Sequence, residues 1–98
     1  MAGASNKVVM YTTPLCGYCA AAKRLLDQKG VDYEDIDIYM DRSRREEMVN
    51  RSGRRTVPQI FIGDIHVGGF DDMNLLEQRG ELDALLANAA GPAETKGD

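Results

Sequence analysis

The sequence predicts an α/β fold in which a small four-stranded mixed sheet is flanked by helices. Short β-rich segments alternate with runs of helix formers in the order β-α-β-α-β-β-α, and one more short helical segment follows. The first two strands are joined through a helix, which favours a parallel pair with a right-handed crossover. The last two strands are joined by a Gly-Asp turn, which favours an antiparallel hairpin. At 98 residues, the chain is long enough for one domain with one core.

The first half of the chain carries a strand, a helix and a second strand. The β-rich run KVVMYT predicts a buried strand over 7–12. Good helix formers followed by Gly30 predict a helix over 20–30 that ends near Lys29. Residues 31–39 alternate apolar side chains with acids, which is typical of a strand.

A second helix is predicted over 41–53. Asp41 and Ser43 are cap candidates at its start, and Glu46 follows Ser43 by three residues, as in a capping box. Gly53 closes the segment, because glycine readily adopts the left-handed conformation that ends many helices.

The second half of the chain predicts a hairpin and two helices. A strand over 56–63 is entered through a proline, and a turn at Gly63–Asp64 leads into a short strand over 65–69. A helix over 71–80 opens with acidic residues, which suit the positive end of a helix, and it closes on a glycine. A fourth, short helix follows over 81–90.

Composition and charge narrow the class of protein. The ordered domain should span 7–90, with flexible termini at 1–6 and 91–98, because both ends are small and polar. A net charge of −4, with basic residues interleaved among acids, argues against a nucleic-acid partner. The first apolar run is too short for a secretory signal or a membrane span. We therefore expect a cytoplasmic protein with no membrane partner.

Both cysteines lie in the stretch YTTPLCGYC, with two residues between them. Cys16 falls where the first strand gives way to a helix, and the free N–H groups and dipole of a helix N-terminus stabilise a thiolate. Cys19 lies in the first turn on the same side but is more covered. We therefore predict that Cys16 is the attacking thiolate and that Cys19 is the resolving thiol. A Cys-x-x-Cys pair beside a βαβ pattern is typical of redox proteins.

The other interpretations of the dithiol fit the chain less well. A structural zinc site needs four Cys or His ligands, whereas the chain has two cysteines and one histidine, His66. A disulfide closing so small a loop would stabilise little, and it would be unusual in a cytoplasmic protein. We expect His66 on a strand facing solvent, with a catalytic role as the minor alternative. Lys23 and Arg24 could add positive potential near the dithiol, but we interpret them as solvated helix charges.

The motifs YTTPLCGYC, TVPQIFIG and GGFDD, in this order and spacing, resemble those of a dithiol glutaredoxin of the CGYC type, similar to bacterial glutaredoxin 3. The resemblance covers about residues 7–86. It implies a thioredoxin-like fold and glutathione-dependent thiol–disulfide exchange, with a role in electron transport and cell redox homeostasis. Thioredoxin itself is a poorer match, because it usually carries a tryptophan before its dithiol, where this chain has Leu15.

The resemblance also implies roles for single residues. Cys16 would take up glutathione in a mixed disulfide, and Cys19 would close an internal disulfide when the substrate is a protein disulfide. Val57 and Pro58 would form the family's cis-proline loop, together with Thr56. The backbone of this loop would pair with the ligand as an added strand.

The GGFDD motif would hold the γ-glutamyl end of glutathione. Gly69 lets the backbone come close to a ligand, and the helix that opens at Asp71 offers N–H groups to a carboxylate. The ligand's amine would lie near Asp72. Phe70 belongs to the same motif, and Tyr18, between the cysteines, offers an amphipathic wall. Capping of the helix by its aspartates is compatible with this role.

One departure from the family pattern concerns charge. The family often has a lysine three residues before the nucleophile, where this chain has Thr13. Arg54 or Arg55 could supply the missing charge from the other side of the ligand, with exposed loop charge as the alternative interpretation. The candidate glutathione-binding residues are therefore Thr13, Tyr18, Arg54, Arg55, Thr56, Val57, Pro58, Gly69, Phe70, Asp71 and Asp72.

A second departure is Gly17, where many dithiol members have proline. Some members without that proline hold a 2Fe-2S cluster between two protomers, ligated by the nucleophilic cysteine of each and by two glutathiones. Four sulfur ligands from two copies of Cys16 and two glutathiones would fit such a cluster. Cluster binding or transfer by a bridged dimer is thus the alternative function. Otherwise we expect a monomer with no metal site, whose partners are glutathione and disulfide-containing or glutathionylated proteins.

Overall fold

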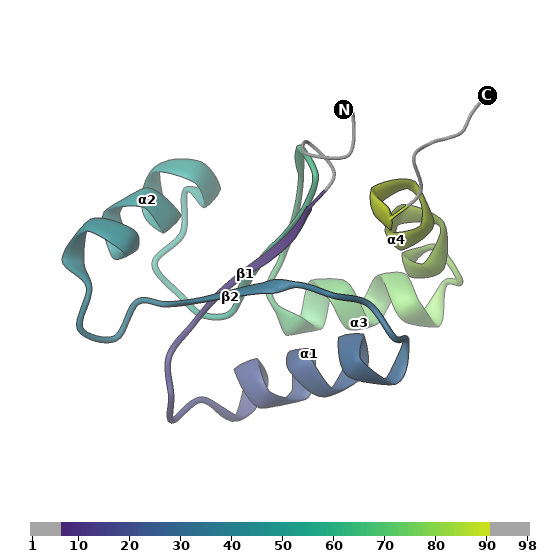
Figure 1. Ribbon diagram of the computed structural model, residues 1–98, viewed down its shortest axis with the longest axis horizontal. Helices are drawn as coiled ribbons and strands as arrows, with labels where there is room; N and C mark the ends of the chain where they lie inside the picture. The colour runs from purple at the N-terminus through teal and green to yellow at the C-terminus, as the bar shows by residue number, and fades with distance from the viewer. Residues whose placement is uncertain (1–6, 91–98) are drawn as a thin grey trace.

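The computed structural model describes residues 7–90, so the flexible termini predicted at 1–6 and 91–98 lie outside the described residues. Two strand–helix units are followed by a hairpin and two helices, as predicted (Figure 1). No helix within 7–90 has both the length and the apolar character needed to cross a bilayer. The elements are β1 (Val8–Thr12), α1 (Gly17–Gln28), β2 (Glu34–Asp37), α2 (Arg42–Ser52), β3 (Gln59–Ile62), β4 (Ile65–Gly68), α3 (Phe70–Gln78) and α4 (Leu82–Ala90).

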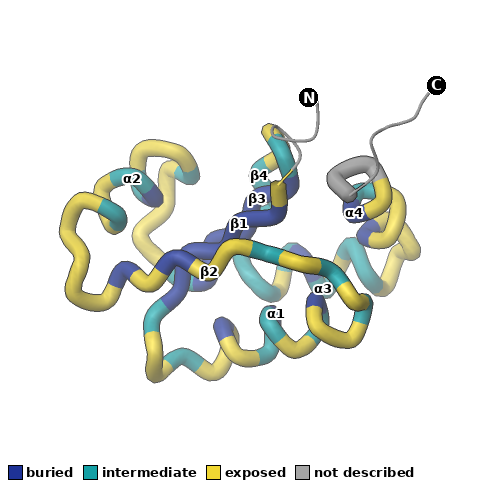
Figure 2. Tube along the Cα trace, in the orientation of Figure 1, coloured by how far each residue is buried: buried dark blue, intermediate teal, exposed yellow. Residues whose placement is uncertain are grey.

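The four strands form one mixed sheet in the order β2-β1-β3-β4. β1 pairs in parallel with β2 and antiparallel with β3, and β4 completes an antiparallel hairpin with β3. Both predicted pairings are confirmed. All residues of β1 are buried, because this strand has a neighbour on each side and helices on both faces. Figure 2 shows β1 as a dark band through the middle of the molecule.

Helices cover both faces of the sheet. α1 and α3 contact each other on one face, and α2 lies apart from them on the other (Figure 1). Met10, Leu26 and Met73 belong to the core of the first face, and Ile38 and Met48 to the core of the second. The apolar interior is therefore divided into two clusters by the sheet, rather than being the one core expected from chain length.

Local chemistry explains where the first helix and the third strand differ from the prediction. α1 begins at Gly17 rather than at residue 20, because Cys16 acts as its N-cap with extended backbone (φ −130°, ψ 113°). The Cys16 sulfur accepts the N–H of Cys19 and so closes a turn that contains few good helix formers. β3 begins at Gln59 rather than at residue 56, since Pro58 has no N–H to give to a strand ladder.

The caps of α2 follow the sequence closely. The Asp41 carboxylate accepts the N–H of Arg44 at 3.1 Å, as expected of an N-cap. Ser43, the other candidate, donates to the same carboxylate at 2.9 Å, so the cap does not rest on a capping box between Ser43 and Glu46. Gly53 ends the helix in the left-handed conformation, with φ +73°.

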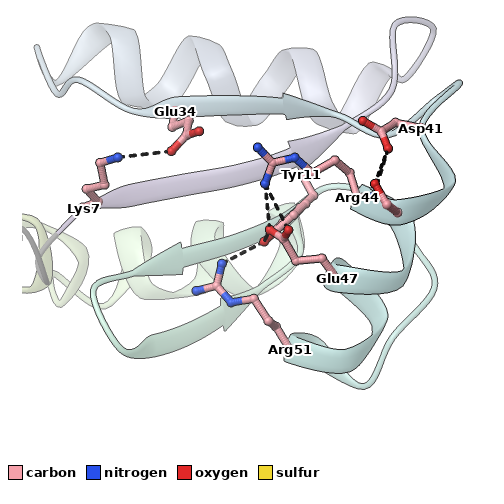
Figure 3. Close-up of polar contacts among 8 residues, drawn as sticks. Lys7, Tyr11, Glu34, Asp41, Arg44, Glu47 and Arg51 are labelled. Atoms are coloured by element: carbon pink, nitrogen blue, oxygen red, sulfur yellow. Dashed lines mark hydrogen bonds and ion pairs between the residues drawn. The ribbon is translucent and has the colours of Figure 1, made fainter.

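A buried hydroxyl ties α2 to the sheet (Figure 3). Tyr11 of β1 is fully buried, and its hydroxyl donates to Glu47 and accepts from Arg51 Nη1 at 2.8 Å. Arg44 donates to the same Glu47 carboxylate at 3.0 and 3.1 Å. Burial raises the pKa of Tyr11, whereas the hydrogen bond from Tyr11 lowers the pKa of Glu47. The polar groups of this face therefore satisfy one another.

Candidate active site

The dithiol sits at the N-terminus of α1, where the sequence placed it. Cys16 is the N-cap residue, and its Sγ accepts the N–H of Cys19 at 3.2 Å. The free N–H groups of the first helical turn give this end of α1 a partial positive charge. Both the hydrogen bond and the helix end therefore favour negative charge on the Cys16 sulfur.

The two thiols differ in their access to solvent. Cys16 is half-buried, whereas Cys19 is 1% exposed. Burial is the largest cause that raises the pKa of Cys19 to about 12, and the hydrogen bond with Cys16 adds to it. Cys19 is therefore a protonated thiol at neutral pH, held on the inner side of Cys16. Of the two sulfurs, Cys16 is the one that an incoming disulfide can reach.

A backbone loop faces the Cys16 sulfur from the opposite side. The peptide bond between Val57 and Pro58 is cis, and the Val57 carbonyl oxygen lies 3.9 Å from Cys16 Sγ. The loop also packs near α3, since a Cβ built on Gly69 would lie 3.5 Å from the Pro58 carbonyl oxygen. The N-termini of α1 and α3 and the loop before β3 therefore converge on one place.

A groove with a volume of about 190 Å³ lies where these segments meet. Its lining holds all but two of the candidate glutathione-binding residues, the exceptions being Thr13 and Arg55. Arg54 is therefore the arginine of the pair that reaches the groove. The lining residues are Tyr18, Arg54, Thr56, Val57, Pro58, Gly69, Phe70, Asp71 and Asp72.

The lining of the groove contains both charged and aromatic side chains. Asp72 Oδ2 accepts the N–H of Gly69 at 2.9 Å and pairs with Arg54 Nη1 at 3.1 Å. The hydrogen bond from Gly69, and then the one from Arg54, hold the pKa of Asp72 below its ordinary value. The rings of Tyr18 and Phe70 stack with centroids 6.4 Å apart. The groove thus offers a carboxylate, a guanidinium, a helix N-terminus and an apolar wall to one ligand.

Gly68 precedes Gly69 of the groove lining, and neither its backbone conformation nor its surroundings suit a side chain. Its φ is +111°, a region that favours glycine. A Cβ at this position would lie 2.3 Å from Asp72 Oδ2. Gly68 therefore leaves the space in which the Asp72 carboxylate turns back to the N–H of Gly69.

The prediction that Lys23 is simply solvated is wrong. Its Nζ lies 2.7 Å from Asp35 Oδ2, and the other oxygen of Asp35 accepts from Thr12 Oγ1 at 2.5 Å. The hydrogen bond to Asp35 is the main cause that raises the pKa of Lys23. Sequence alone could not supply this contact, because it joins α1 to β2 across the crossover.

His66 also differs from its prediction, because it is half-buried rather than facing solvent. Its ring stacks on Phe61 with centroids 4.8 Å apart, and its Nε2 lies 2.7 Å from Gln59 Oε1. Burial lowers the pKa of His66. Gln59 was not singled out from the sequence, where only its place beside the Val-Pro pair could have drawn attention to it.

Comparison with known proteins assigns a family to this arrangement. A family model described as glutaredoxin matches residues 8–67, more than half of the chain. Glutaredoxin 3 from Escherichia coli is 52% identical over 79 residues, which are 81% of this chain and 95% of that protein. The predicted resemblance is confirmed.

Solved structures extend the comparison to the fold. The crystal structure of a buckwheat glutaredoxin–glutathione complex is 32% identical, with a TM-score of 0.80, and covers 90% of this chain and 83% of that one. A structure described as "Metal Binding of Glutaredoxins" is 51% identical, with a TM-score of 0.66, and covers 86% of this chain and 91% of that one. The predicted thioredoxin-like fold is confirmed. Glutaredoxins are in general thiol–disulfide oxidoreductases, and the Cys16–Cys19 pair fits such a redox centre. The chain belongs to the glutaredoxin family.

Proposed function

We propose that this protein is a glutathione-dependent oxidoreductase that reduces protein disulfides and protein–glutathione mixed disulfides through Cys16 and Cys19. The observation that carries the proposal is the position of Cys16. Its sulfur accepts an N–H from the first turn of α1 at 3.2 Å and lies beside a groove, 3.9 Å from the Val57 carbonyl oxygen. A thiolate at this point is stabilised by the helix end and remains open to a disulfide.

Glutathione fits the groove by its chemistry. It carries two carboxylates, one α-amino group and a short peptide backbone. The Val57 backbone can pair with that peptide as an added strand, and the N-terminus of α3 can hold the γ-glutamyl carboxylate, with the amine near Asp72. Arg54 can share its charge between Asp72 and the remaining carboxylate, which replaces the lysine absent at Thr13. The complex of buckwheat glutaredoxin with glutathione supports this choice of ligand.

The reaction with a glutathionylated protein needs one cysteine. The Cys16 thiolate attacks the glutathione sulfur, a new S–S bond forms, and the protein leaves as its thiolate. A free glutathione thiolate then attacks the glutathione sulfur of this mixed disulfide. Oxidised glutathione leaves and the Cys16 thiolate is restored, so two electrons have passed from glutathione to the substrate. The helix end assists both steps, because it stabilises Cys16 as attacker and as leaving group.

The reaction with a protein disulfide also needs Cys19. After Cys16 has formed a mixed disulfide with the substrate, Cys19 must lose its proton and attack the Cys16 sulfur. The second substrate thiolate leaves, and the internal Cys16–Cys19 disulfide is then reduced by two glutathiones. Burial of Cys19 restricts it to this intramolecular attack, because external disulfides cannot reach it.

The test separates the two cysteines. Cys16→Ser should abolish both activities in a glutathione-coupled assay. Cys19→Ser should retain the reduction of a glutathionylated protein while losing most of the reduction of a protein disulfide. If Cys16→Ser stayed active, or if the intact protein reduced neither substrate, the proposed function would be wrong.

The role of Arg54 can be tested against its neighbour. Arg54→Ala should raise the KM for glutathionylated substrate, because it removes a cation from the groove. Arg55→Ala is the matched control, since Arg55 does not line the groove. Unchanged KM values in both variants would rule out Arg54 as the substitute for the family's lysine.

A second candidate function is the binding or transfer of an iron–sulfur cluster, and Gly17 is the observation that favours it. No atom lies within 4 Å of a Cβ built on Gly17, so the surface beside Cys16 is open at the position where the sequence departs from the family pattern. The related structure described as "Metal Binding of Glutaredoxins" points the same way. Cys19 is too buried to serve as a ligand, so each of two protomers would contribute Cys16 and a bound glutathione.

The test of this second function is spectroscopic. The protein would be incubated anaerobically with iron, sulfide and glutathione, and then examined by visible absorption and size-exclusion chromatography. A brown dimer that is lost in Cys16→Ser and kept in Cys19→Ser would support the second function. A colourless monomer would exclude it and leave the protein as the monomeric oxidoreductase.

A further inference from the structure

The segment Thr56–Pro58 lines the groove, but it does not belong to the sheet. The strand ladder begins only at Gln59, which pairs with Tyr11 of β1. Within the described residues, the hydrogen bonds that reach this segment come from the Gln59 side chain and from Cys16. The position of the ligand-facing backbone therefore depends on side chains rather than on strand pairing.

The Gln59 side chain turns back along the chain to hold this segment. Its Nε2 donates to the Thr56 carbonyl oxygen and to Thr56 Oγ1, both at 3.1 Å. Its Oε1 lies 2.7 Å from His66 Nε2 on the neighbouring strand. The side chain is fully buried, so these partners replace water for both ends of the amide.

These contacts also fix the proton on His66. The amide hydrogens of Gln59 are both directed to Thr56, so its Oε1 can only accept, and His66 Nε2 must carry the hydrogen. The ring is held on Phe61, with centroids 4.8 Å apart at 26°, and the Arg51 guanidinium lies 4.1 Å from the same Phe61 centroid. The Gln59 side chain is therefore hydrogen-bonded on one side to His66 of the hairpin and on the other side to Thr56.

Charged groups approach His66 from three elements. Arg51 lies on α2, Arg54 lies in the loop before β3, and Asp72 lies on α3. Nε2 carries a hydrogen in both the neutral and the charged imidazole, so the bond to Gln59 survives a change of protonation. The arrangement therefore behaves as a fixed support and not as a pH switch.

We propose that Gln59 and His66 are positioning residues that hold the backbone of Thr56 and Val57 in the geometry that binds glutathione. Neither residue lines the groove, so Gln59 acts on it through the loop, whereas His66 also faces Arg54 and Asp72 of the lining. The proposal rests on the proposed function, because it concerns the ligand of the same site. It assigns a role to a buried amide that the redox chemistry of the dithiol does not use.

The test measures the glutathionylation equilibrium of Cys16 in the full chain carrying Cys19→Ser. The Cys16 thiolate reacts with oxidised glutathione, giving the mixed disulfide and one glutathione thiolate. Gln59→Met keeps the size of the side chain but removes its donors and its acceptor. We expect it to lower the equilibrium constant roughly fivefold to tenfold, because the two hydrogen bonds that hold Thr56 are lost. In the enzyme with both cysteines, the KM should rise while kcat changes little.

Two controls distinguish positioning from general damage. Tyr11→Phe removes the hydroxyl of the cross-strand neighbour of Gln59, and with it the hydrogen bonds to Glu47 and from Arg51, without touching Thr56. It should lower stability and leave the equilibrium constant unchanged. Alkylation of Cys16 by iodoacetamide should proceed at the same rate in Gln59→Met, because that reagent does not use the loop. His66→Phe keeps the stacked ring, removes the N–H, and should lower the equilibrium constant in the same direction.

The outcomes separate this proposal from the proposed function. If the protein with Gln59 and His66 intact does not form the mixed disulfide, the proposed function fails. If it does, and both Gln59→Met and His66→Phe match it, the positioning role is overturned. Should Gln59→Met not fold, His66→Phe decides the question, because His66 is only half-buried.

Discussion

Cys19 acts on the active site in two separate ways. Its backbone N–H donates to Cys16 Sγ at 3.2 Å, and its side chain is a buried thiol. Replacing the side chain with serine leaves the N–H in place, so the stabilisation that this donor gives to the Cys16 thiolate is retained. The Cys19→Ser variant therefore isolates the resolving step from the attacking step.

Selective alkylation should follow from the difference between the thiols. Near neutral pH, iodoacetamide should label Cys16 of the reduced protein while Cys19 reacts at least roughly tenfold more slowly, because the reagent needs a reachable thiolate. Burial raises the pKa of Cys19 to about 12, which keeps it protonated. Peptide mass mapping over time would measure both rates. Equal labelling of the two cysteines would contradict this assignment.

A methyl group at Gly68 should displace the Asp72 carboxylate that lines the groove. In Gly68→Ala the new Cβ would meet the Asp72 carboxylate at 2.3 Å, and the φ of +111° would be strained. We expect lower thermal stability and a higher KM for glutathionylated substrate. Gly17→Ala is the matched control, because no atom lies within 4 Å of its Cβ. Similar behaviour of the two variants would count against the role given to Gly68.

At the level of elements, α2 depends on polar contacts as much as on apolar ones. Met48 is its only fully buried side chain among the described residues, and Glu47 provides the link to the Tyr11 hydroxyl. α1 and α3 bury their apolar sides against the other face of the sheet, where a larger cluster has formed. The contacts that hold α2 on the sheet should therefore depend more strongly on pH than those of α1 and α3.

Acid should weaken this attachment through Glu47. The Tyr11 hydrogen bond lowers the folded-state pKa of Glu47 below its unfolded value, so its contribution is complete above that unfolded value. It is lost as the pH falls through the lowered pKa. Glu47→Gln should therefore flatten the acid side of a plot of unfolding free energy against pH, measured by denaturant titration. Glu46→Gln, on the neighbouring exposed residue, should leave the slope unchanged.

Over the whole molecule, local sequence patterns predicted the order and direction of the elements, whereas only the family resemblance implied their arrangement as a thioredoxin-like fold. Alternation, caps and the Gly63–Asp64 turn are local signals, and they gave the element order and both strand pairings. β1 lies between β2 and β3, and this strand order depends on long-range pairing that no local sequence pattern indicates. The core is divided into two clusters as a result of this strand order, because a central strand must be covered on both faces.

The lining of the groove, too, could be predicted only in part from local sequence patterns. Motifs identified its lining because ligand-facing residues fall in short segments, but no motif distinguishes between the two adjacent arginines before Thr56. In the structure Arg54 lines the groove and Arg55 does not. Contacts between distant segments, such as the pair of Arg54 with Asp72 or of Gln59 with His66, carry no sequence signal. These contacts could be identified only from the structure.

The placement of α2 apart from α1 and α3 has a consequence for the order in which the native state opens (Figure 1). Amide hydrogens exchange through local unfolding, and segments with the least buried apolar surface open at the lowest free energy. The amides of α2 should therefore take up deuterium before those of α1, while β1 should be protected longest. Since α2 leads directly into the loop that carries Val57, glutathione that orders this loop should also slow exchange in the last turn of α2.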